Sequence, residues 1–330
     1  MPVEIKALEF ERIGTGQTGA CYRFHLEHEA RAPKTVILKI AAGTPEQRER
    51  LRRGYRAEVL FYETVAPRSA VQTPACWYAA VSGTGDNFTL ILEDADPAIA
   101  GEQERGCSIA EAFDALINLA RLHASTWNAD ILRAEAAWLQ TTPERAIRLA
   151  GIYADAVEHF LERYHDNFSA AEAATFRDAV PAMRGWLEDD QLPQVLIHGD
   201  YRLDNLLFRA GGDRPVLAVD WQTLEVGQPG RDVAYFIVTA LDSDQRRGFE
   251  NRLLAAYHSE LLANGIGNYD LEACRLDYRR GALQAALITI VGCLFATGDR
   301  SAKSDGMFLS MAHRAAQAIR ELDTITLVTV

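Results

Sequence analysis

The sequence predicts an α+β fold in two units: a small sheet-plus-helix unit over residues 1–95 and a larger, mostly helical unit over residues 96–330. Short, β-branched apolar runs dominate the first unit, whereas long stretches with helical spacing dominate the second. The charge changes at the same place. The first unit carries equal numbers of basic and acidic side chains, so the second holds the whole net charge of −12.

Five runs in the first unit have the composition of strands, and each is bounded by Gly, Pro, Asn or charged residues. They are ALEFERIG, CYRFHLEH, TVILKIA, CWYAAVSG and FTLILED. SGTGDN, residues 82–87, joins the last two with the turn chemistry of a hairpin, which favours a small antiparallel sheet. One main helix interrupts the strands over residues 45–66, with Ala57, Leu60 and Phe61 on one face.

The second unit shows helical patterns over residues 109–126, 142–165 and 171–190. Two short apolar runs interrupt them, QVLIHGD and RPVLAVDW, and both contain an Asp at their end. Residues 281–298 are nearly long enough for a membrane span, but the stretch contains Gln284 and is followed at once by charged residues. We therefore expect a buried core helix there.

The composition excludes several classes of protein. With 48% apolar and 24% charged residues, the chain has the balance of a soluble globular protein. Its five cysteines form no CxxC pair, which argues against a zinc ribbon or a disulfide framework and fits a reducing cytoplasm. No apolar core of signal-peptide length opens the sequence, and an acidic chain is a poor partner for nucleic acid. We expect a cytoplasmic protein without membrane or nucleic-acid partners.

Polar side chains that suit a divalent cation follow both short apolar runs. HGDYRLDNLLF contains Asp200 and, five residues later, Asn205, and VDWQ contains Asp220. Two carboxylates and an amide oxygen suit Mg²⁺, which usually keeps waters and takes few protein ligands. Phosphoryl transfer needs such a metal and an acceptor for the attacking hydroxyl's proton. Each Asp alone is as readily a turn former or a helix cap, but the complete string favours a phosphoryl-transfer site.

Lys39 is one of only four lysines and lies inside the apolar run TVILKI. It could simply point outward from an edge strand. The functional alternative is a cation that pairs with ATP phosphates and is held by a carboxylate on the following helix. Glu58, nineteen residues later, is the candidate carboxylate.

Gly14, Gly16 and Gly19 form GxGxxG between two predicted strands. Glycines let backbone amides approach phosphates without interference from a Cβ. Three glycines between strands can also make a plain hairpin. A dinucleotide site needs a helix directly after the glycines, whereas CYRFHLEH predicts a strand, so a nicotinamide or flavin enzyme is a more distant alternative.

HGDYRLDN followed by VDWQ resembles the catalytic loop and metal-binding segment of the aminoglycoside phosphotransferase and choline kinase group, within the protein-kinase-like fold. TPACWYAAV, LILEDAD, LARLHAST and VDWQTLEVGQPGRDVAYFI resemble the ecdysteroid-kinase-like branch and its bacterial relatives. The resemblance runs from about residue 10 to at least residue 240. It implies an ATP-binding N-lobe over residues 1–95 and a C-lobe over residues 96–330 with the catalytic loop, metal site and substrate pocket.

The resemblance also implies roles for particular residues. Asp200 would accept the proton of the substrate hydroxyl, while Asn205 and Asp220 would hold Mg²⁺ on the ATP phosphates. Arg202 would steady the transferring phosphate, with a plain salt bridge to Asp204 as the equal alternative.

Other residues would support the site. Backbone groups near Glu93, Asp94 and Ala95 would meet adenine at the hinge between the lobes. His198 would fix the catalytic loop by hydrogen bonding, and Asp232 would hold that loop from behind.

We therefore expect an ATP- and Mg²⁺-dependent phosphotransferase that acts on a hydroxyl of a small molecule. Gly199 follows the loop histidine where protein kinases have Arg, and no activation segment is found, which removes the case for a protein substrate. The alternative is a catalytically silent nucleotide-binding or scaffolding protein of the same fold. For the phosphotransferase, the substrate could be a cationic amino alcohol, an apolar hydroxylated compound or a hydroxyacyl thioester.

Overall fold

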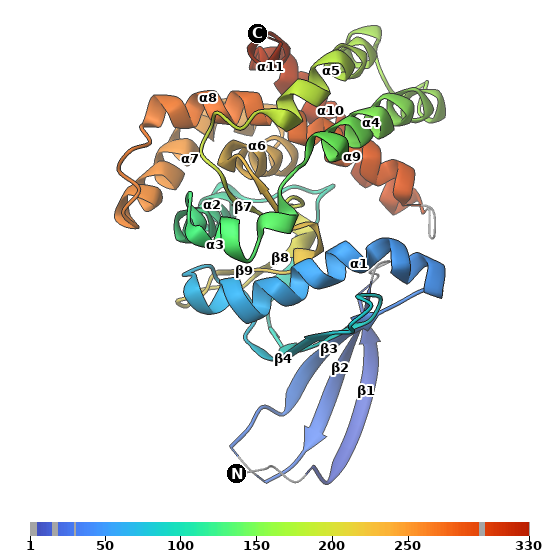
Figure 1. Ribbon diagram of the computed structural model, residues 1–330, viewed down its shortest axis with the longest axis vertical. Coiled ribbons are helices and arrows are strands. Elements are labelled where there is room, and N and C mark those ends of the chain that lie inside the picture. The colour runs from blue at the N-terminus through green and yellow to red at the C-terminus, as the bar shows by residue number, and fades with distance from the viewer. Residues whose placement is uncertain (1–4, 15–18, 30, 297–300, 330) are drawn as a thin grey trace.

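The computed structural model describes residues 5–14, 19–29, 31–296 and 301–329 (Figure 1). The N-terminal part is a five-stranded antiparallel sheet in the order β1-β2-β3-β5-β4, as the five strand-like runs predict. Its strands are β1 (Ala7–Ile13), β2 (Gly19–Glu27), β3 (Thr35–Ala41), β4 (Cys76–Val81) and β5 (Phe88–Glu93).

Helix α1 (Pro45–Leu60) packs against the sheet and begins at a capping box formed by Thr44 and Gln47. The sequence predicts one helix to residue 66, but the regular α pitch ends at Leu60. A wider π turn (Phe61–Val65) and a 3₁₀ turn (Ala66–Arg68) follow. In the wider turn the Phe61 ring stacks on Trp221 at 3.5 Å, which ties the end of the helix to the C-lobe.

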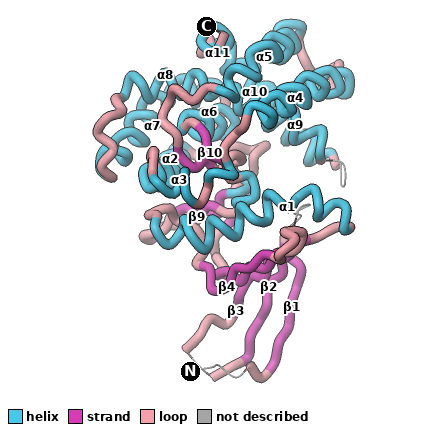
Figure 2. The backbone as a smooth tube through the Cα atoms, in the orientation of Figure 1, coloured by secondary structure: helices cyan, strands magenta, loops and turns pink. Residues whose placement is uncertain are grey.

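The remainder of the chain is mostly helical (Figure 2), and the three helical patterns predicted after residue 108 are confirmed. The helices are α2 (Ile109–Thr126), α3 (Asp130–Ala134), α4 (Pro143–Arg163), α5 (Ala170–Glu188), α6 (Pro229–Ala240), α7 (Ser243–Ala263), α8 (Leu271–Gly281), α9 (Leu283–Phe295), α10 (Ala302–Glu321) and α11 (Thr324–Val328). All residues of α6 are buried, because α8, α9 and α10 pack around it.

Short strands carry the loops between the lobes. They are β6 (Ile99–Ala100), β7 (Val195–Ile197), β8 (Leu206–Phe208), β9 (Val216–Ala218) and β10 (Glu225–Gly227), with 3₁₀ turns at Ala137–Leu139, Leu203–Asn205 and Trp221–Thr223. Strand β8 pairs with β6 and β9, and β7 pairs with β10. The two apolar runs that the sequence singles out become β7 and β9, so the polar residues after each run enter loops.

The apolar stretch at 281–298 contains α9, whose side chains Leu283, Ala286 and Ile290 are buried in the C-lobe. The expected core helix is therefore confirmed for the part of this stretch that the structure describes. Within the described ranges, none of the helices has the length and apolar character needed to cross a membrane.

Candidate active site

Lys39 bridges two carboxylates from distant parts of the chain. Its Nζ lies 2.7 Å from Glu58 Oε1 on α1 and 2.9 Å from Asp220 Oδ1 after β9. Gln222 donates to the other oxygen of Glu58 at 3.0 Å. Burial by itself would lower the pKa of Lys39, but the charges of Asp220 and Glu58 outweigh it and raise that pKa, so the lysine stays cationic.

Asp220 adopts the left-handed conformation with φ +65°, which is uncommon for a residue other than glycine. Its side chain is 41% exposed, whereas Glu58 is 1% exposed. Burial of the carboxyl would raise the pKa of Asp220, but the Lys39 charge and hydrogen bond lower it below the ordinary value. The unusual backbone thus accompanies an ionised carboxylate that stays partly exposed.

The sheet face that carries Lys39 also carries apolar side chains. Cys21 stands opposite both Ile13 and Lys39 in the strand register, and Ile37 lies two residues before the lysine on β3. Because side chains alternate along a strand, these residues share the lysine's face. Burial raises the pKa of the Cys21 thiol, so the thiol is protonated and contributes only apolar bulk.

The glycine-rich loop ends directly above this lysine. A Cβ placed on Gly19 would lie 3.4 Å from Lys39 Cε and 3.2 Å from the Ile40 carbonyl oxygen. Gly14 has φ +68°, a conformation that favours glycine. Gly16, the third predicted glycine, lies outside the described residues.

Asp200 lies in the loop between β7 and β8 and receives hydrogen bonds from two elements. Tyr235 on α6 donates to Oδ1 at 2.8 Å, and Asn205 Nδ2 donates to Oδ2 at 3.1 Å and to the Asp200 carbonyl at 2.9 Å. Burial, followed by the nearby carboxylate, raises the pKa of Tyr235, so its hydroxyl keeps the proton that it donates. These donors fix the orientation of the carboxylate.

Asn205 is oriented for a role as an oxygen ligand. Both groups that its amide nitrogen contacts are acceptors, so this nitrogen is the donor end of the amide, and Oδ1 has no hydrogen bond to any residue that the structure describes. The Val219 amide donates to the Asn205 carbonyl at 3.0 Å, and the next residue is Asp220. The β8–β9 hairpin therefore brings the Asn205 amide and the Asp220 carboxylate to the same end of the sheet.

The Asn205 amide oxygen and the Asp220 carboxylate suit Mg²⁺, which takes other ligands from phosphates and water, better than they suit an ion whose ligands all come from protein. Within the described ranges, no three His, Cys, Asp or Glu side chains are grouped to hold an ion. One carboxylate and one amide oxygen match the few oxygen ligands that Mg²⁺ takes beside phosphates and waters.

Arg202 lies between two carboxylates, since its guanidinium is 3.3 Å from Asp200 Oδ2 and 3.4 Å from Asp204 Oδ2. Its Nη1 also contacts Met307 Sδ at 3.0 Å. The salt bridge to Asp204 is therefore present, and the guanidinium also lies beside Asp200.

The loop that carries Asp200 is held from behind by Asp232, as the sequence predicts. Asp232 is fully buried and accepts from the main-chain amides of His198 at 2.5 Å and Gly199 at 2.9 Å. His198 accepts the Asp200 amide at Nδ1, at 3.3 Å, and its Nε2 donates to the Val219 carbonyl at 3.0 Å. One histidine thus connects the Asp200 and Asp220 loops.

At the hinge, side chains hold the backbone. The Glu93 carboxylate accepts from Arg214 at 3.0 Å and Arg209 at 3.3 Å, while the Glu93 amide donates to the Ala75 carbonyl. The Ala95 carbonyl accepts from Arg209 at 3.2 Å. The Ala95 N–H has no partner in the described part of the chain, which leaves it as a donor for a ligand.

Residues 15–265 match the model of the ecdysteroid kinase-like family. That range is most of the chain. The chain belongs to the ecdysteroid kinase-like family.

Solved structures share the fold of this family member. Choline kinase from Cryptosporidium parvum Iowa II is 11% identical, with a TM-score of 0.59 over 97% of this chain and 91% of that chain. Ethanolamine kinase from Plasmodium vivax is 13% identical, with a TM-score of 0.57 over 96% and 83%. The GDP complex of wild-type aminoglycoside 2′-phosphotransferase-IIIa is 14% identical, with a TM-score of 0.55 over 95% and 94%. The two-lobe, protein-kinase-like fold implied by the sequence resemblance is confirmed.

Curated relatives match a shorter segment of this family member. Acyl-CoA dehydrogenase family member 11 of Homo sapiens is 38% identical over 72 residues, which are 20% of this chain and 9% of that protein. Family member 10 of Mus musculus is 32% identical over 91 residues, 26% of this chain and 8% of that protein. The matched segment spans less than a tenth of either relative.

Sequence reasoning missed Gln222, Trp221 and Tyr235. Tyr235 lies three residues after Asp232 on α6, so helical spacing places both on the face behind the catalytic loop. That signal was available in the sequence. Gln222 contacts Glu58 on α1, and Trp221 stacks on Phe61 in the π turn that follows α1. Both contacts join residues more than a hundred positions apart, and no local pattern indicates them.

Proposed function

We propose that this family member transfers the γ-phosphoryl group of ATP to a hydroxyl of a small molecule, with Mg²⁺ as cofactor. One observation carries the proposal: the Lys39–Glu58–Asp220 ion triad is joined to the Asp200 loop through His198 and the Val219 backbone. Nucleotide-bound phosphotransferases of the same fold, such as the GDP complex named above, support a nucleotide site in this cleft.

Each residue has a separate task in this proposal. Lys39 offers a fixed positive charge to phosphate oxygens, and Glu58 keeps it on the sheet. The Asp200 carboxylate, oriented by Tyr235, accepts the proton of the attacking hydroxyl. Arg202 lies beside that carboxylate and adds a second positive charge where phosphoryl charge develops.

Asn205 Oδ1 and the Asp220 carboxylate would hold the Mg²⁺, which neutralises phosphate charge when it is bound. The ion triad assists this role, because Lys39 is shared between two carboxylates and does not neutralise Asp220 alone. At the hinge, the Ala95 N–H is the donor that the adenine ring would meet.

The test is ADP release from Mg·ATP across hydroxylated compounds: aminoglycosides, choline-like amino alcohols, sterols and hydroxyacyl thioesters. Asp200→Asn should abolish transfer and keep nucleotide binding. Asp213→Asn is the matched control, because Asp213 is an exposed aspartate on the turn between β8 and β9. Asp220→Ala should weaken Mg·ATP binding itself. Wild-type turnover in Asp200→Asn would contradict the assignment of Asp200 as the catalytic base. Mg·ATP binding by the wild type without transfer to any compound would favour a catalytically silent protein.

A further inference from the structure

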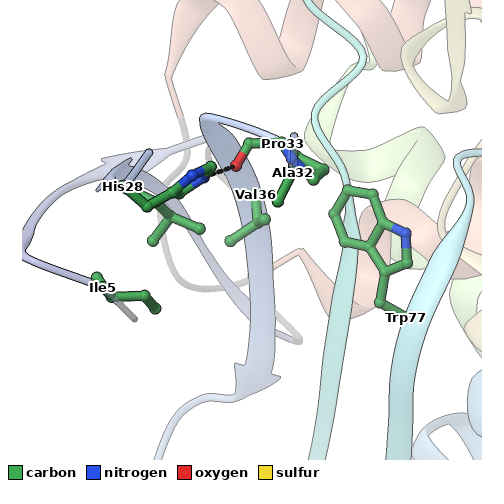
Figure 3. Close-up of a pocket in the computed structure, with 7 residues that line it drawn as sticks. Ile5, His28, Ala32, Pro33, Val36 and Trp77 are labelled. Atoms are coloured by element: carbon green, nitrogen blue, oxygen red, sulfur yellow. Dashed lines mark hydrogen bonds between the residues drawn. The ribbon is translucent and has the colours of Figure 1, made fainter. Parts of the chain in front are cut away.

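His28 and Gln284 are buried polar side chains that the proposed catalytic cycle does not use, 5% and 1% exposed. His28 borders an apolar hollow beside the N-terminal sheet, and its Nε2 donates to the Pro33 carbonyl at 2.9 Å (Figure 3). Both residues of that bond belong to the β2–β3 connection, so its effect is local. Gln284 on α9 instead donates from Nε2 to the Gly199 carbonyl at 2.9 Å, 85 positions away in the loop that carries Asp200.

The Gly199–Asp200 peptide group sets the direction in which the Asp200 side chain leaves the loop. This group is planar and trans, so the Gly199 C=O and the Asp200 N–H point in opposite directions from one rigid unit. Gln284 holds the carbonyl end at 2.9 Å, and His198 Nδ1 accepts the amide end at 3.3 Å. Gly199, with φ +82°, restrains the group less than another residue would, because it has no Cβ to limit rotation. The two side chains therefore supply the restraint that the glycine lacks, and the Gln284 bond is the shorter.

The Gln284 amide is itself fixed in orientation. Arg231 Nε donates to Oε1 at 3.0 Å, and because a guanidinium only donates, Oε1 is the acceptor end and Nε2 the donor end. Arg231 is 6% exposed, pairs with Glu225 at 2.9 Å and lies over the Trp186 ring at 5.0 Å. The glutamine thus joins a buried, charge-compensated arginine to the backbone of the loop.

Two roles account for a buried glutamine at this position. It could serve Arg231 alone, or it could serve the loop as well. A carboxylate would pair with the arginine more strongly than an amide does, but it has no donor for a carbonyl. The amide satisfies Arg231 and Gly199 at once, so its donor end is the part that the arginine does not explain.

We propose that Gln284 is a positioning residue for phosphoryl transfer, which rests on the proposed function above. By holding the Gly199–Asp200 peptide group, it sets where the Asp200 carboxylate meets the substrate hydroxyl. Gln284 touches neither nucleotide nor substrate in this proposal. A displacement of about 1 Å at a reacting group can cost about 100-fold in rate, so a contact behind the loop is sufficient to affect transfer.

Gln284→Glu separates the two roles. At pH 8 the new carboxylate beside Arg231 is ionised, so it keeps the arginine contact and turns an acceptor toward the Gly199 carbonyl. We expect kcat to fall about 10- to 100-fold, with the KM for ATP within about twofold of the wild type. Gln228→Glu is the matched control, because Gln228 is 6% exposed and its Nε2 also donates to a main-chain carbonyl, that of Asp189. This control should keep the wild-type kcat.

Hydrogen exchange of the loop amides gives a readout that needs no turnover. The amides of Gly199, Asp200 and Arg202 all have acceptors within the fold. They should exchange at least about tenfold faster in Gln284→Glu and at the wild-type rate in Gln228→Glu. Gln284→Met, which is neutral and of similar length, should show the same changes, and it replaces Gln284→Glu if far-UV circular dichroism shows that variant to be unfolded.

Two outcomes would overturn the proposal: wild-type kcat and loop exchange in Gln284→Glu, and equal losses of kcat in Gln284→Glu and Gln228→Glu. Failure of the proposed function looks different, because the wild type itself would then transfer phosphate to no compound. Faster loop exchange confined to the Gln284 variants would still support the restraint of the loop in that case.

Discussion

Glu58→Ala, compared with Glu158→Ala, measures what burial adds to an ion pair in this protein. Glu58 and Lys39 lie 2.7 Å apart with side chains 1% and 10% exposed, whereas Glu158 and Arg177 lie 2.8 Å apart with side chains 61% and 51% exposed. The two ion pairs have nearly the same N–O distance, but only the Glu58–Lys39 pair is buried. The pair of variants therefore isolates the effect of removing a partner from a buried charge.

The expected magnitudes differ several-fold. Removing one partner of a buried pair costs about 3–5 kcal/mol, because it leaves a buried charge without compensation. Lys39 keeps Asp220, so we expect about 3 kcal/mol for Glu58→Ala. The exposed pair contributes at most about 1 kcal/mol, so Glu158→Ala should lose no more than that.

Urea unfolding followed by far-UV circular dichroism gives the free energy of unfolding of each variant. Phosphoryl transfer should also fall about 100-fold in Glu58→Ala, since Lys39 would follow its remaining partner and leave its place above the phosphates. Glu158→Ala should keep wild-type transfer. Equal losses of unfolding free energy in the two variants would refute the reasoning, because burial would then contribute nothing to the pair.

Three further predictions concern the catalytic loop and a buried carboxyl. Gly199→Ala should lose at least about 100-fold in transfer, because its Cβ would lie 2.4 Å from the Thr223 carbonyl oxygen; Gly211→Ala, also at positive φ but with open space around it, should keep its activity, and equal losses in both would contradict the steric cause. Tyr235→Phe should lower kcat about tenfold or more and leave KM unchanged, since it removes a donor to the Asp200 carboxylate; steady-state kinetics with an unchanged kcat would show that this donor is dispensable. Burial raises the pKa of Asp277 to about 6, so between about pH 4 and 6 the folded state keeps a proton that the unfolded state loses, and stability falls as pH rises, by about 3 kcal/mol in total. Unfolding free energies at several pH values should show this fall in the wild type and not in Asp277→Asn.

The sequence predicts much of the site because several of its links are local. Asp200 and Asn205 are five residues apart, so one loop brings them together. The strand-like run TVILKI places Lys39 on β3, and the helical pattern places Glu58 on α1. Local spacing is sufficient here, because neighbouring residues have few ways to be arranged.

Other contacts were decided only by the packing of the lobes. The Lys39–Asp220 pair joins residues 181 positions apart, and Gln222 reaches Glu58 over 164 positions. The same holds for the sheet face opposite Lys39: alternation in β1 shows that Leu8 and Phe10 share a face, but the sequence does not show that α1 packs on the other side of the sheet and that both side chains stay exposed. Periodicity fixes which side chains lie together on one element, whereas the neighbour that covers them depends on chain segments that no local pattern connects.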